Sequence, residues 1–403
     1  MPNSAPPPHL TYCTNIHPGE SWAEVRDNLV RYLVPVRERF APGAPFGVGL
    51  RLSAESAEAL DDPEALEELR EFLRAHDLYV FTINGFPYGP FHGRPVKEAV
   101  YRPDWLQPER LAYTNRLADI LAAVLPVGME GTISTVPGAF APRVNGERDA
   151  ERMAQAMLDH AAHLVHLHAT TGRRVVLALE PEPCCYLETI AETVEFFARH
   201  LLSPRAISSF SATTGLDALA AESAIREHLG VCLDTCHMAV EFEEPAQVLD
   251  TLDAAGIRVA KVQVTAGLRV LLAGDDAEAL GALAAFADDV YLHQVVERRA
   301  DGGLSRYLDL PQAIAAAGER TAEELREWRV HFHVPVFRER YGQFEGTQAY
   351  VAEALREVRE RTACTHFEVE TYTWDVLPEE FRREGIVAAI VRELEWAEER
   401  VRR

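Results

Sequence analysis

Short apolar runs alternate with longer amphipathic stretches along most of the chain. A new apolar run begins roughly every thirty to fifty residues, and each run is too short to be a buried helix. Alternation of this kind is typical of parallel strands that are joined by crossover helices. Seven runs fit the pattern, and they cover residues 10–16, 46–52, 79–85, 131–136, 175–180, 230–236 and 259–265.

The number of runs favours a (β/α)8 barrel over a doubly wound sheet. No Gly-x-Gly-x-x-Gly turn follows any of them, which weakens a dinucleotide-binding fold further. Three more strand-like runs follow at 290–296, 328–336 and 365–372, so ten runs compete for eight places. We therefore expect one barrel domain over residues 1–403, closed by the last run, with an elaboration at 266–327 between the seventh and eighth strands.

Charge and composition exclude several classes of partner. The chain has 63 acidic and 40 basic residues, a net charge of −23, which argues against nucleic acid and anionic membrane surfaces. No apolar run reaches the length of a membrane span, and the proline-rich start, residues 1–9, lacks a signal-peptide core. We expect this start to be disordered and the protein to be cytoplasmic, without membrane insertion. The six cysteines lack a framework spacing, and we interpret them as reduced thiols.

Polar residues of one kind end several of the predicted strands. The run 230–236 leads into Asp234, and Glu180, Gln263 and Glu370 stand equally late in their own runs. Since the carboxyl ends of barrel strands meet at one mouth, we expect all four side chains to point into it. A solvated loop with an isolated Asp is the alternative for Asp234, and surface ion pairs are the alternative for the glutamates.

Three carboxylates and one amide oxygen form a ligand set for a divalent cation. Oxygen ligands of this kind suit Mg²⁺ or Mn²⁺, and Zn²⁺ or Co²⁺ are also compatible with them. A shared ion is also the simplest way to hold like charges together away from water. Glu182 is a rival to Glu180, and Glu368 lies on the same strand face as Glu370, so either pair could exchange roles.

Histidines and early-loop residues add candidates for substrate contacts. His331 and His333 share one strand face, and we favour a functional role, as an extra metal ligand or a substrate contact, for His333. His331 and His293 can equally be buried structural histidines. The candidate substrate-binding residues are Arg51, Asn84, His92, Lys97 and His293.

At the strand-end residues, the sequence resembles the xylose-isomerase-like TIM barrels, the sugar isomerase and epimerase superfamily. The resemblance rests on Glu180, on Asp234-x-x-His237, on Gln263 and on Glu370. It implies one divalent metal ion held at the barrel mouth by residues of the fifth to eighth strands. The stretch between Gln263 and Glu370 is longer than one strand–helix unit, which leaves open whether Gln263 or His333 is the seventh-strand ligand.

Over nearly its full length, the chain resembles more closely the TIM-barrel metabolite traffic proteins of the ebo gene cluster. The resembling stretches are 10–20, 82–92, 327–335 and 370–374. This resemblance implies a small polar metabolite as the partner and does not fix a reaction. The sequence leaves open a homo-oligomer.

Together these features predict isomerisation or epimerisation of a small sugar-like hydroxy-carbonyl compound through an enediolate. In that reaction Glu180 and Glu370 would act as general base and acid on opposite sides of the reacting carbon. His237 and His333 would hold substrate oxygens. A metal-dependent hydrolase or lyase on the same barrel and a non-catalytic metabolite-binding traffic protein are the alternatives.

Overall fold

The computed structural model describes residues 7–90, 92, 95–273, 276–318 and 325–402. Most of the start that we expected to be disordered lies outside these ranges. Its last residue, His9, is ordered and begins the first strand.

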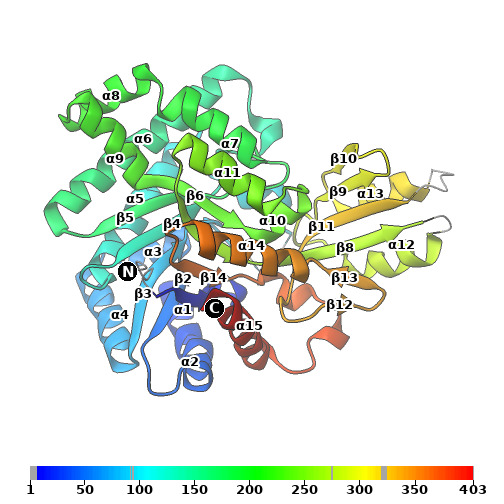
Figure 1. The fold of residues 1–403 in the computed structure, drawn as a ribbon. Helices are drawn as coiled ribbons and strands as arrows, with labels where there is room; N and C mark the ends of the chain where they lie inside the picture. Colours follow the sequence, from blue (N-terminus) through cyan, green and yellow to red (C-terminus); the bar gives the residue numbers. More distant parts are fainter. Residues whose placement is uncertain (1–6, 91, 93–94, 274–275, 319–324, 403) are drawn as a thin grey trace.

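Eight parallel strands form a nearly closed barrel, which confirms the (β/α)8 prediction (Figure 1). The strand order around the sheet is β1-β14-β7-β6-β5-β4-β3-β2, so β6, which carries Asp234, lies between two neighbours and not at an edge. The barrel strands are β1 (His9–Tyr12), β2 (Phe46–Arg51), β3 (Leu78–Asn84), β4 (Glu130–Thr135), β5 (Arg174–Leu179), β6 (Leu229–Asp234), β7 (Val259–Val264) and β14 (His366–Val369).

The barrel closes between β1 and β2 through a threonine hydroxyl. Thr11 Oγ1 donates to Gly47 O at 2.8 Å and accepts from Gly49 N at 3.0 Å. One isolated parallel bridge, between Cys13 and Gly49, continues this contact. The hydroxyl thus takes the place of part of the backbone ladder and satisfies buried backbone groups on β2.

Amphipathic helices cover the outside of the barrel (Figure 1). Two of them begin with a capping box, formed by Ser21 with Glu24 and by Thr189 with Glu192. No helix among the described residues is long and apolar enough to cross a bilayer. The helices around the barrel are α1 (Trp22–Asn28), α2 (Val34–Phe40), α3 (Ala54–Ala59), α4 (Pro63–Ala75), α5 (Pro108–Val124), α6 (Glu147–Thr171), α7 (Ile190–Phe196), α8 (Pro204–Thr214), α9 (Ala218–His228), α10 (Thr235–Val240), α11 (Pro245–Ala255), α14 (Gln348–Arg361) and α15 (Ile386–Val401).

A second, antiparallel sheet is inserted between β7 and β14 and extends to one side of the barrel (Figure 1). Its strand order is β10-β9-β11-β8-β13-β12, and it reaches Gly346, past the limit of 327 that the sequence predicted. Its elements are β8 (Ala266–Leu272), α12 (Ala277–Leu283), β9 (Val295–Arg299), β10 (Leu304–Tyr307), α13 (Leu310–Gly318), β11 (Arg326–Val334), β12 (Arg340–Tyr341) and β13 (Phe344–Gly346).

The predicted strand at 290–296 is wrong for most of its length, since β9 begins only at Val295. Asp288 Oδ1 accepts from the backbone N–H groups of Val290 (2.6 Å) and Tyr291 (3.0 Å). A side chain that bonds nearby backbone donors in this way competes with ladder pairing and favours a turn. The apolar run is therefore a loop, and it is directed toward the barrel mouth.

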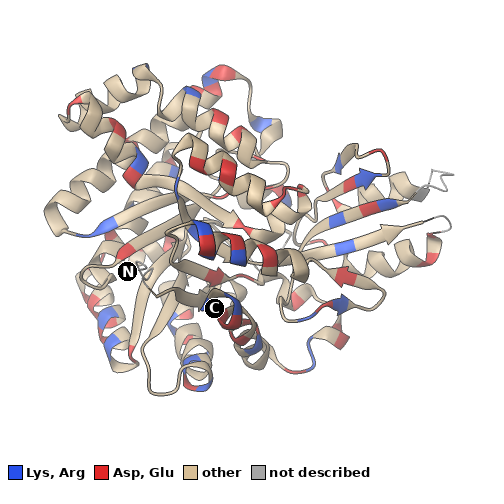
Figure 2. Ribbon diagram, viewed as in Figure 1, with Lys and Arg blue, Asp and Glu red and all other residues tan. Residues whose placement is uncertain are grey.

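Basic and acidic residues lie close together on the second sheet, as the blue and red bands in Figure 2 show. Glu327 on β11 pairs with Arg269 (3.0 Å), Arg298 (2.8 Å) and Arg329 (3.0 Å). Although partial burial opposes ionisation, Arg269 and Arg329 lower the pKa of Glu327 to about 2. The inserted sheet is thus held together partly by charge, in a chain that is acidic overall.

An ion pair fills the barrel interior below the mouth. Lys261 Nζ on β7 lies 2.5 Å from Glu368 Oε2 on β14, and both side chains are fully buried. Burial alone would lower the pKa of Lys261, but Glu368 raises it above its ordinary value. Gly49 on β2 makes room for this pair, because a Cβ at Gly49 would overlap Glu368 Oε1 and lie 2.7 Å from Tyr12 O.

Gly49→Ala should therefore destabilise the fold. Overpacking against a buried carboxylate and a strand backbone is expected to reduce the free energy of unfolding by about 1–3 kcal/mol. Equilibrium denaturation in urea measures the change. Gly281→Ala in α12 is the control, because no heavy atom lies within 4 Å of its added Cβ and alanine favours a helix. Equal stability of the two variants would contradict this account.

Candidate metal centre

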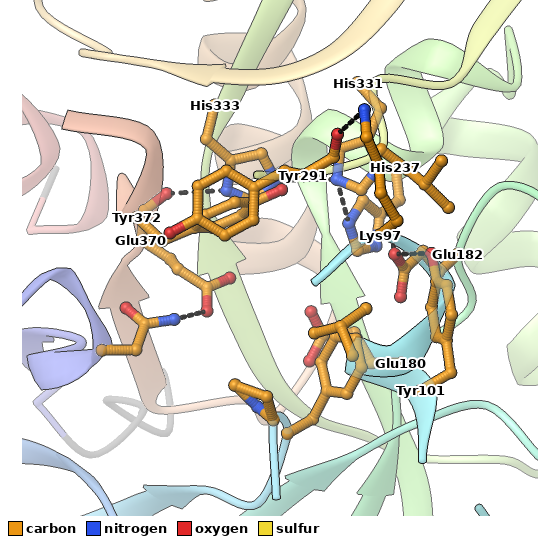
Figure 3. Close-up of a pocket in the computed structure, with 15 residues that line it drawn as sticks. Lys97, Tyr101, Glu180, Glu182, His237, Tyr291, His331, His333, Glu370 and Tyr372 are labelled. Atoms are coloured by element: carbon orange, nitrogen blue, oxygen red, sulfur yellow. Dashed lines mark hydrogen bonds and ion pairs between the residues drawn. The ribbon is translucent and has the colours of Figure 1, made fainter. Parts of the chain in front are cut away.

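A pocket of about 470 Å³, its open side included, lies at the carboxyl ends of the barrel strands. Figure 3 shows that acidic side chains line one part of it and histidines another. The long loop after β3 and the inserted sheet contribute the rest of the wall, including Lys97, Tyr101 and Tyr291. The pocket therefore combines residues of the barrel with residues of the insertion.

Three predicted ligands converge here, two of them in the pocket wall (Glu180 and Glu370) and the third, Asp234, close behind it. Glu180, Asp234 and Glu370 follow or end β5, β6 and β14, and all three are buried. One carboxylate oxygen of each lies within 4.8 Å of the others, which is close enough for one ion to bind all three. The barrel topology thus brings together residues that are far apart in the sequence.

Asp234 is held rigidly by the start of α10. Its Oδ1 accepts from Cys236 N (2.7 Å), His237 N (3.0 Å) and Thr265 Oγ1 (2.5 Å). The first two bonds are those of an N-cap, so α10 begins where its cap places the carboxylate. Asp234 Oδ2 has no hydrogen-bond partner among the described residues, although it is buried. This oxygen is oriented for a ligand.

Gln263 lies beside Asp234 in the sheet, since the two residues are register partners on β7 and β6. Its side chain is fully buried, and neither its Oε1 nor its Nε2 has a hydrogen-bond partner within the described part of the chain. An unsatisfied buried amide costs free energy, so a ligand for Gln263 Oε1 would stabilise this arrangement.

Two asparagines orient Glu370. Its Oε1 accepts from Asn15 Nδ2 at 2.6 Å and from Asn84 Nδ2 at 2.8 Å. Asn84, a predicted substrate contact, therefore bonds a candidate ligand. Both amides donate, so they favour the ionised form of the carboxylate and leave its second oxygen for other partners.

Burial and mutual repulsion raise the pKa values of the three carboxyl groups. For Glu180, burial is the larger cause and the charge of Asp234 the next; for Glu370, burial is followed by the charge of Glu180. Burial also raises the pKa of Asp234, against the opposing effect of His333. These groups resist ionisation together unless a cation joins them. The donor set and the unpartnered oxygens therefore fit a divalent ion.

Three histidines lie beside the carboxylates. His237 Nε2 is 3.0 Å from His331 Nε2, and His331 Nε2 is 3.2 Å from His333 Nε2. His237 and His333 also lie with Asp234 in a group that could hold a metal ion. The two predicted histidines thus reach the pocket, and His331, for which the sequence left a structural role equally open, joins them.

The predicted cationic substrate contacts have protein partners. Lys97 lines the pocket, but its Nζ donates to Asp309 Oδ2 at 2.8 Å and to Tyr291 O at 2.7 Å. Arg51 pairs with Glu20 at 3.0 Å and does not line the pocket. Their role in substrate binding stays a prediction, and both tie loops together at the mouth.

The two predicted histidine contacts lie one layer behind the pocket wall. His92 Nε2 lies 2.7 Å from Asn15 O, and its Nδ1 lies 3.2 Å from Tyr291 Oη. His293 Nε2 lies 2.5 Å from Asp288 Oδ2. Neither histidine lines the pocket, so a contact with substrate stays a prediction for both.

Sequence reasoning missed Tyr101 and left Glu182 as a mere rival of Glu180. Both line the pocket, and Tyr101 Oη donates to Glu182 Oε1 at 2.8 Å (Figure 3). Glu182 also lies with His237 and His331 in a possible metal-binding group. The Glu-Pro-Glu sequence was the signal for Glu182, whereas Tyr101 lies in a long loop that offers no period to interpret.

Comparison with known proteins gives structural likenesses only. No family model matches the chain, and no curated protein matches it. Among solved structures, D-allulose 3-epimerase from Methylomonas sp. in complex with D-allulose shares 12% identity over 98% of both chains, with a TM-score of 0.49. The IolI protein with a bound zinc atom shares 12% over 98% of both, at 0.48. The probable 3-DHS dehydratase AsbF from Bacillus anthracis shares 14% over 97% of this chain and 98% of its own, at 0.46.

Asp234→Ala should abolish stoichiometric binding of divalent metal while the fold survives. The change removes the oxygen that faces both the carboxylates and the histidines, and loss of the α10 cap costs only about 1 kcal/mol. Metal analysis after dialysis, with circular dichroism as the check on folding, measures this. Glu241→Gln, a buried carboxyl that pairs with Arg306 outside the pocket, is the control. Full metal content in the Asp234 variant would locate the site elsewhere.

Glu182→Gln should make the metal-free protein more stable, and increasingly so as the pH rises. Burial raises the pKa of Glu182 to about 8. The hydrogen bond from Tyr101 opposes this rise, and the charge of Asp234 adds to it. The pKa of Glu182 is higher in the folded protein than in the unfolded chain. The contribution of Glu182 to the free energy of unfolding is therefore fully present below about pH 4.3, and it is lost as the pH rises toward 8. Urea unfolding of both proteins between pH 5 and pH 8, in the presence of a chelator, measures the difference. A difference that is constant with pH would contradict the assignment.

Proposed function

We propose that the protein is a metal-dependent isomerase or epimerase of a small hydroxy-carbonyl compound. The observation that carries the proposal is the pair Glu180 and Glu370, two buried glutamates that follow different strands and enter one pocket (Figure 3). They share a candidate metal centre with Asp234. Isomerisation and epimerisation both need one group that removes a proton from carbon and a second that returns it.

The two glutamates suit proton transfer because their environment does not favour full ionisation. Burial and the neighbouring negative charges raise the pKa values of both, and a bound cation would oppose that rise, which leaves two carboxylates able to exchange a proton with substrate. Glu370 is fixed by its bonds from Asn15 and Asn84, while Glu180 Oε2 has no partner among the described side chains. In our proposal Glu180 takes the proton and Glu370 returns it, or the reverse for the opposite direction.

The metal would be held by Glu180, Asp234 and Glu370, with Gln263 as the fourth ligand. When bound, a divalent ion polarises a carbonyl and stabilises negative charge on its oxygen. Asp234 and Gln263 have no further role in this scheme and serve only to position. We prefer Gln263 to His333 as the remaining ligand, because His333 lies among the other histidines.

Side chains around the carboxylates define a small and partly apolar enclosure. Phe86, Leu292 and Tyr372 contribute to the pocket wall and would exclude water from the reacting carbon. A polar contact would come from Tyr101. The resemblance of stretches 82–92 and 327–335 to the ebo metabolite traffic proteins is consistent with a small polar metabolite as substrate.

Glu180→Gln and Glu370→Gln test the proposal. Each change keeps an oxygen ligand and the side-chain shape but removes the base, so turnover should fall roughly 10²–10⁴-fold while metal content changes little. The assay is incubation with candidate hydroxy-ketones and aldoses in deuterated water, followed by measurement of carbon-bound deuterium. Glu241→Gln is the matched control, a buried carboxyl outside the pocket.

The results of this assay distinguish an isomerase or epimerase from a binding protein and from a hydrolase. Deuterium in the substrate with wild type and with Glu241→Gln, but not with the two pocket variants, supports the proposal. Tight binding of a candidate without any exchange would overturn it and favour a metabolite-binding traffic protein. Cleavage of a candidate without exchange would favour a hydrolase.

A further inference from the structure

His237, His331 and His333 meet through the same ring atom. The Nε2 atoms of His237 and His331 lie 3.0 Å apart, and those of His331 and His333 lie 3.2 Å apart. All three rings are buried, two of them come from β11 and one from α10. Figure 3 shows them above the carboxylates, on the side of the inserted sheet. The position of the proton in each ring decides what the Nε2 atoms can bind.

The opposite ring nitrogen, Nδ1, faces an oxygen acceptor in every case. His237 Nδ1 lies 3.0 Å from Pro181 O, and His333 Nδ1 lies 3.0 Å from Glu370 O. A backbone carbonyl can only accept a hydrogen bond, so both Nδ1 atoms must carry the proton. In a neutral ring the Nε2 atom then has a lone pair and no hydrogen.

The same holds for His331, whose Nδ1 lies 2.7 Å from Gln294 Oε1. The orientation of this amide is fixed by its other end: Gln294 Nε2 donates to Pro183 O at 3.2 Å and to Tyr101 Oη at 2.8 Å. Since Pro183 O accepts only, the atom next to His331 is the amide oxygen. His331 Nδ1 is therefore also the donor.

The Nε2 lone pair of His331 thus lies against those of His237 and His333 in a buried place, with no hydrogen in either contact. Neutral imidazole nitrogens arranged in this way repel one another unless a cation lies between them. In tetrahedral zinc sites, with Zn–N bonds of about 2.0–2.1 Å, nitrogen ligands lie roughly 3.3 Å apart. The two observed separations are close to that value.

We propose that His237, His331 and His333 bind a second divalent ion, of borderline character such as Zn²⁺, distinct from the ion of the carboxylate site. Asp234 Oδ2, which has no hydrogen-bond partner in the described chain, lies 3.9 Å from the Nε2 atoms of both His237 and His333 and is the candidate fourth ligand. Asp234 would then be shared by the two sites. Imidazole ligands favour Zn²⁺, whereas the neighbouring oxygen ligands suit Mn²⁺ or Mg²⁺.

The inference does not depend on the proposed reaction, because metal binding is counted without turnover. The test uses the full-length protein, stripped with a chelator and then loaded separately with Zn²⁺ or Mn²⁺. Wild type should retain about two zinc ions per chain, and His331→Ala about one. The Mn²⁺ content of the variant should stay that of wild type, since His331 is not in the carboxylate group.

His228→Ala is the matched control, because His228 is a buried histidine whose Nδ1 also faces a carbonyl, Val175 O at 2.8 Å, at the amino ends of β5 and β6. It should bind as much zinc as wild type. Equal zinc content in His331→Ala and wild type, or one zinc ion per chain in wild type, would overturn the proposal.

If His331→Ala fails to fold, X-ray absorption at the zinc edge of the wild-type protein decides the matter. Three imidazoles on one of two zinc ions give strong multiple scattering and support the proposal. A spectrum of oxygen ligands with at most one imidazole would refute it.

Discussion

Repulsion between Glu180, Asp234 and Glu370 is the constraint on which the site depends. Their oxygens approach within 4.8 Å in a buried place, where the repulsion between like charges is far stronger than in water. Lys261 contributes one positive charge below them, but it lies 2.5 Å from Glu368 and is largely balanced by that carboxylate. A cation at the mouth would relieve the repulsion and would also give a partner to Glu180 Oε2 and Asp234 Oδ2, which have no hydrogen-bond partner among the described residues.

The fold supplies the rigidity that this arrangement needs. Parallel strands end at one mouth, the cap of α10 holds Asp234, and two asparagine amides hold Glu370. The inserted sheet brings the histidines to the same place through an irregularity in β11. Its pairing with β8 shifts register between Val330 and Val334, and His331 and His333 lie within that interval. Bulges of this kind commonly redirect side chains next to active sites.

The sequence could predict the barrel and its strand-end carboxylates because both follow from local periodicity. Asp234 and Glu370 each stand late in a predicted strand, and the parallel topology then dictates that they meet. The loop at 290–294 could not be predicted in this way. Its sequence pattern suits a strand, but the Asp288 side chain accepts hydrogen bonds from the backbone of Val290 and Tyr291 and favours a turn. Lys97 likewise gave no sign of its partner, because Asp309 is distant in the sequence and belongs to the insertion. Pairing between residues that are distant in the sequence leaves no periodic pattern along the chain.

Anomalous diffraction from crystals grown with Mn²⁺ tests the central claim most directly. Data collected above and below the manganese absorption edge locate the ion without any assumption about activity. The account predicts a manganese peak within coordination distance, about 2.0–2.3 Å, of one oxygen each from Glu180, Asp234 and Glu370. A fully occupied manganese peak elsewhere, or well-ordered carboxylates in this pocket that hold no ion at saturating Mn²⁺, would contradict it.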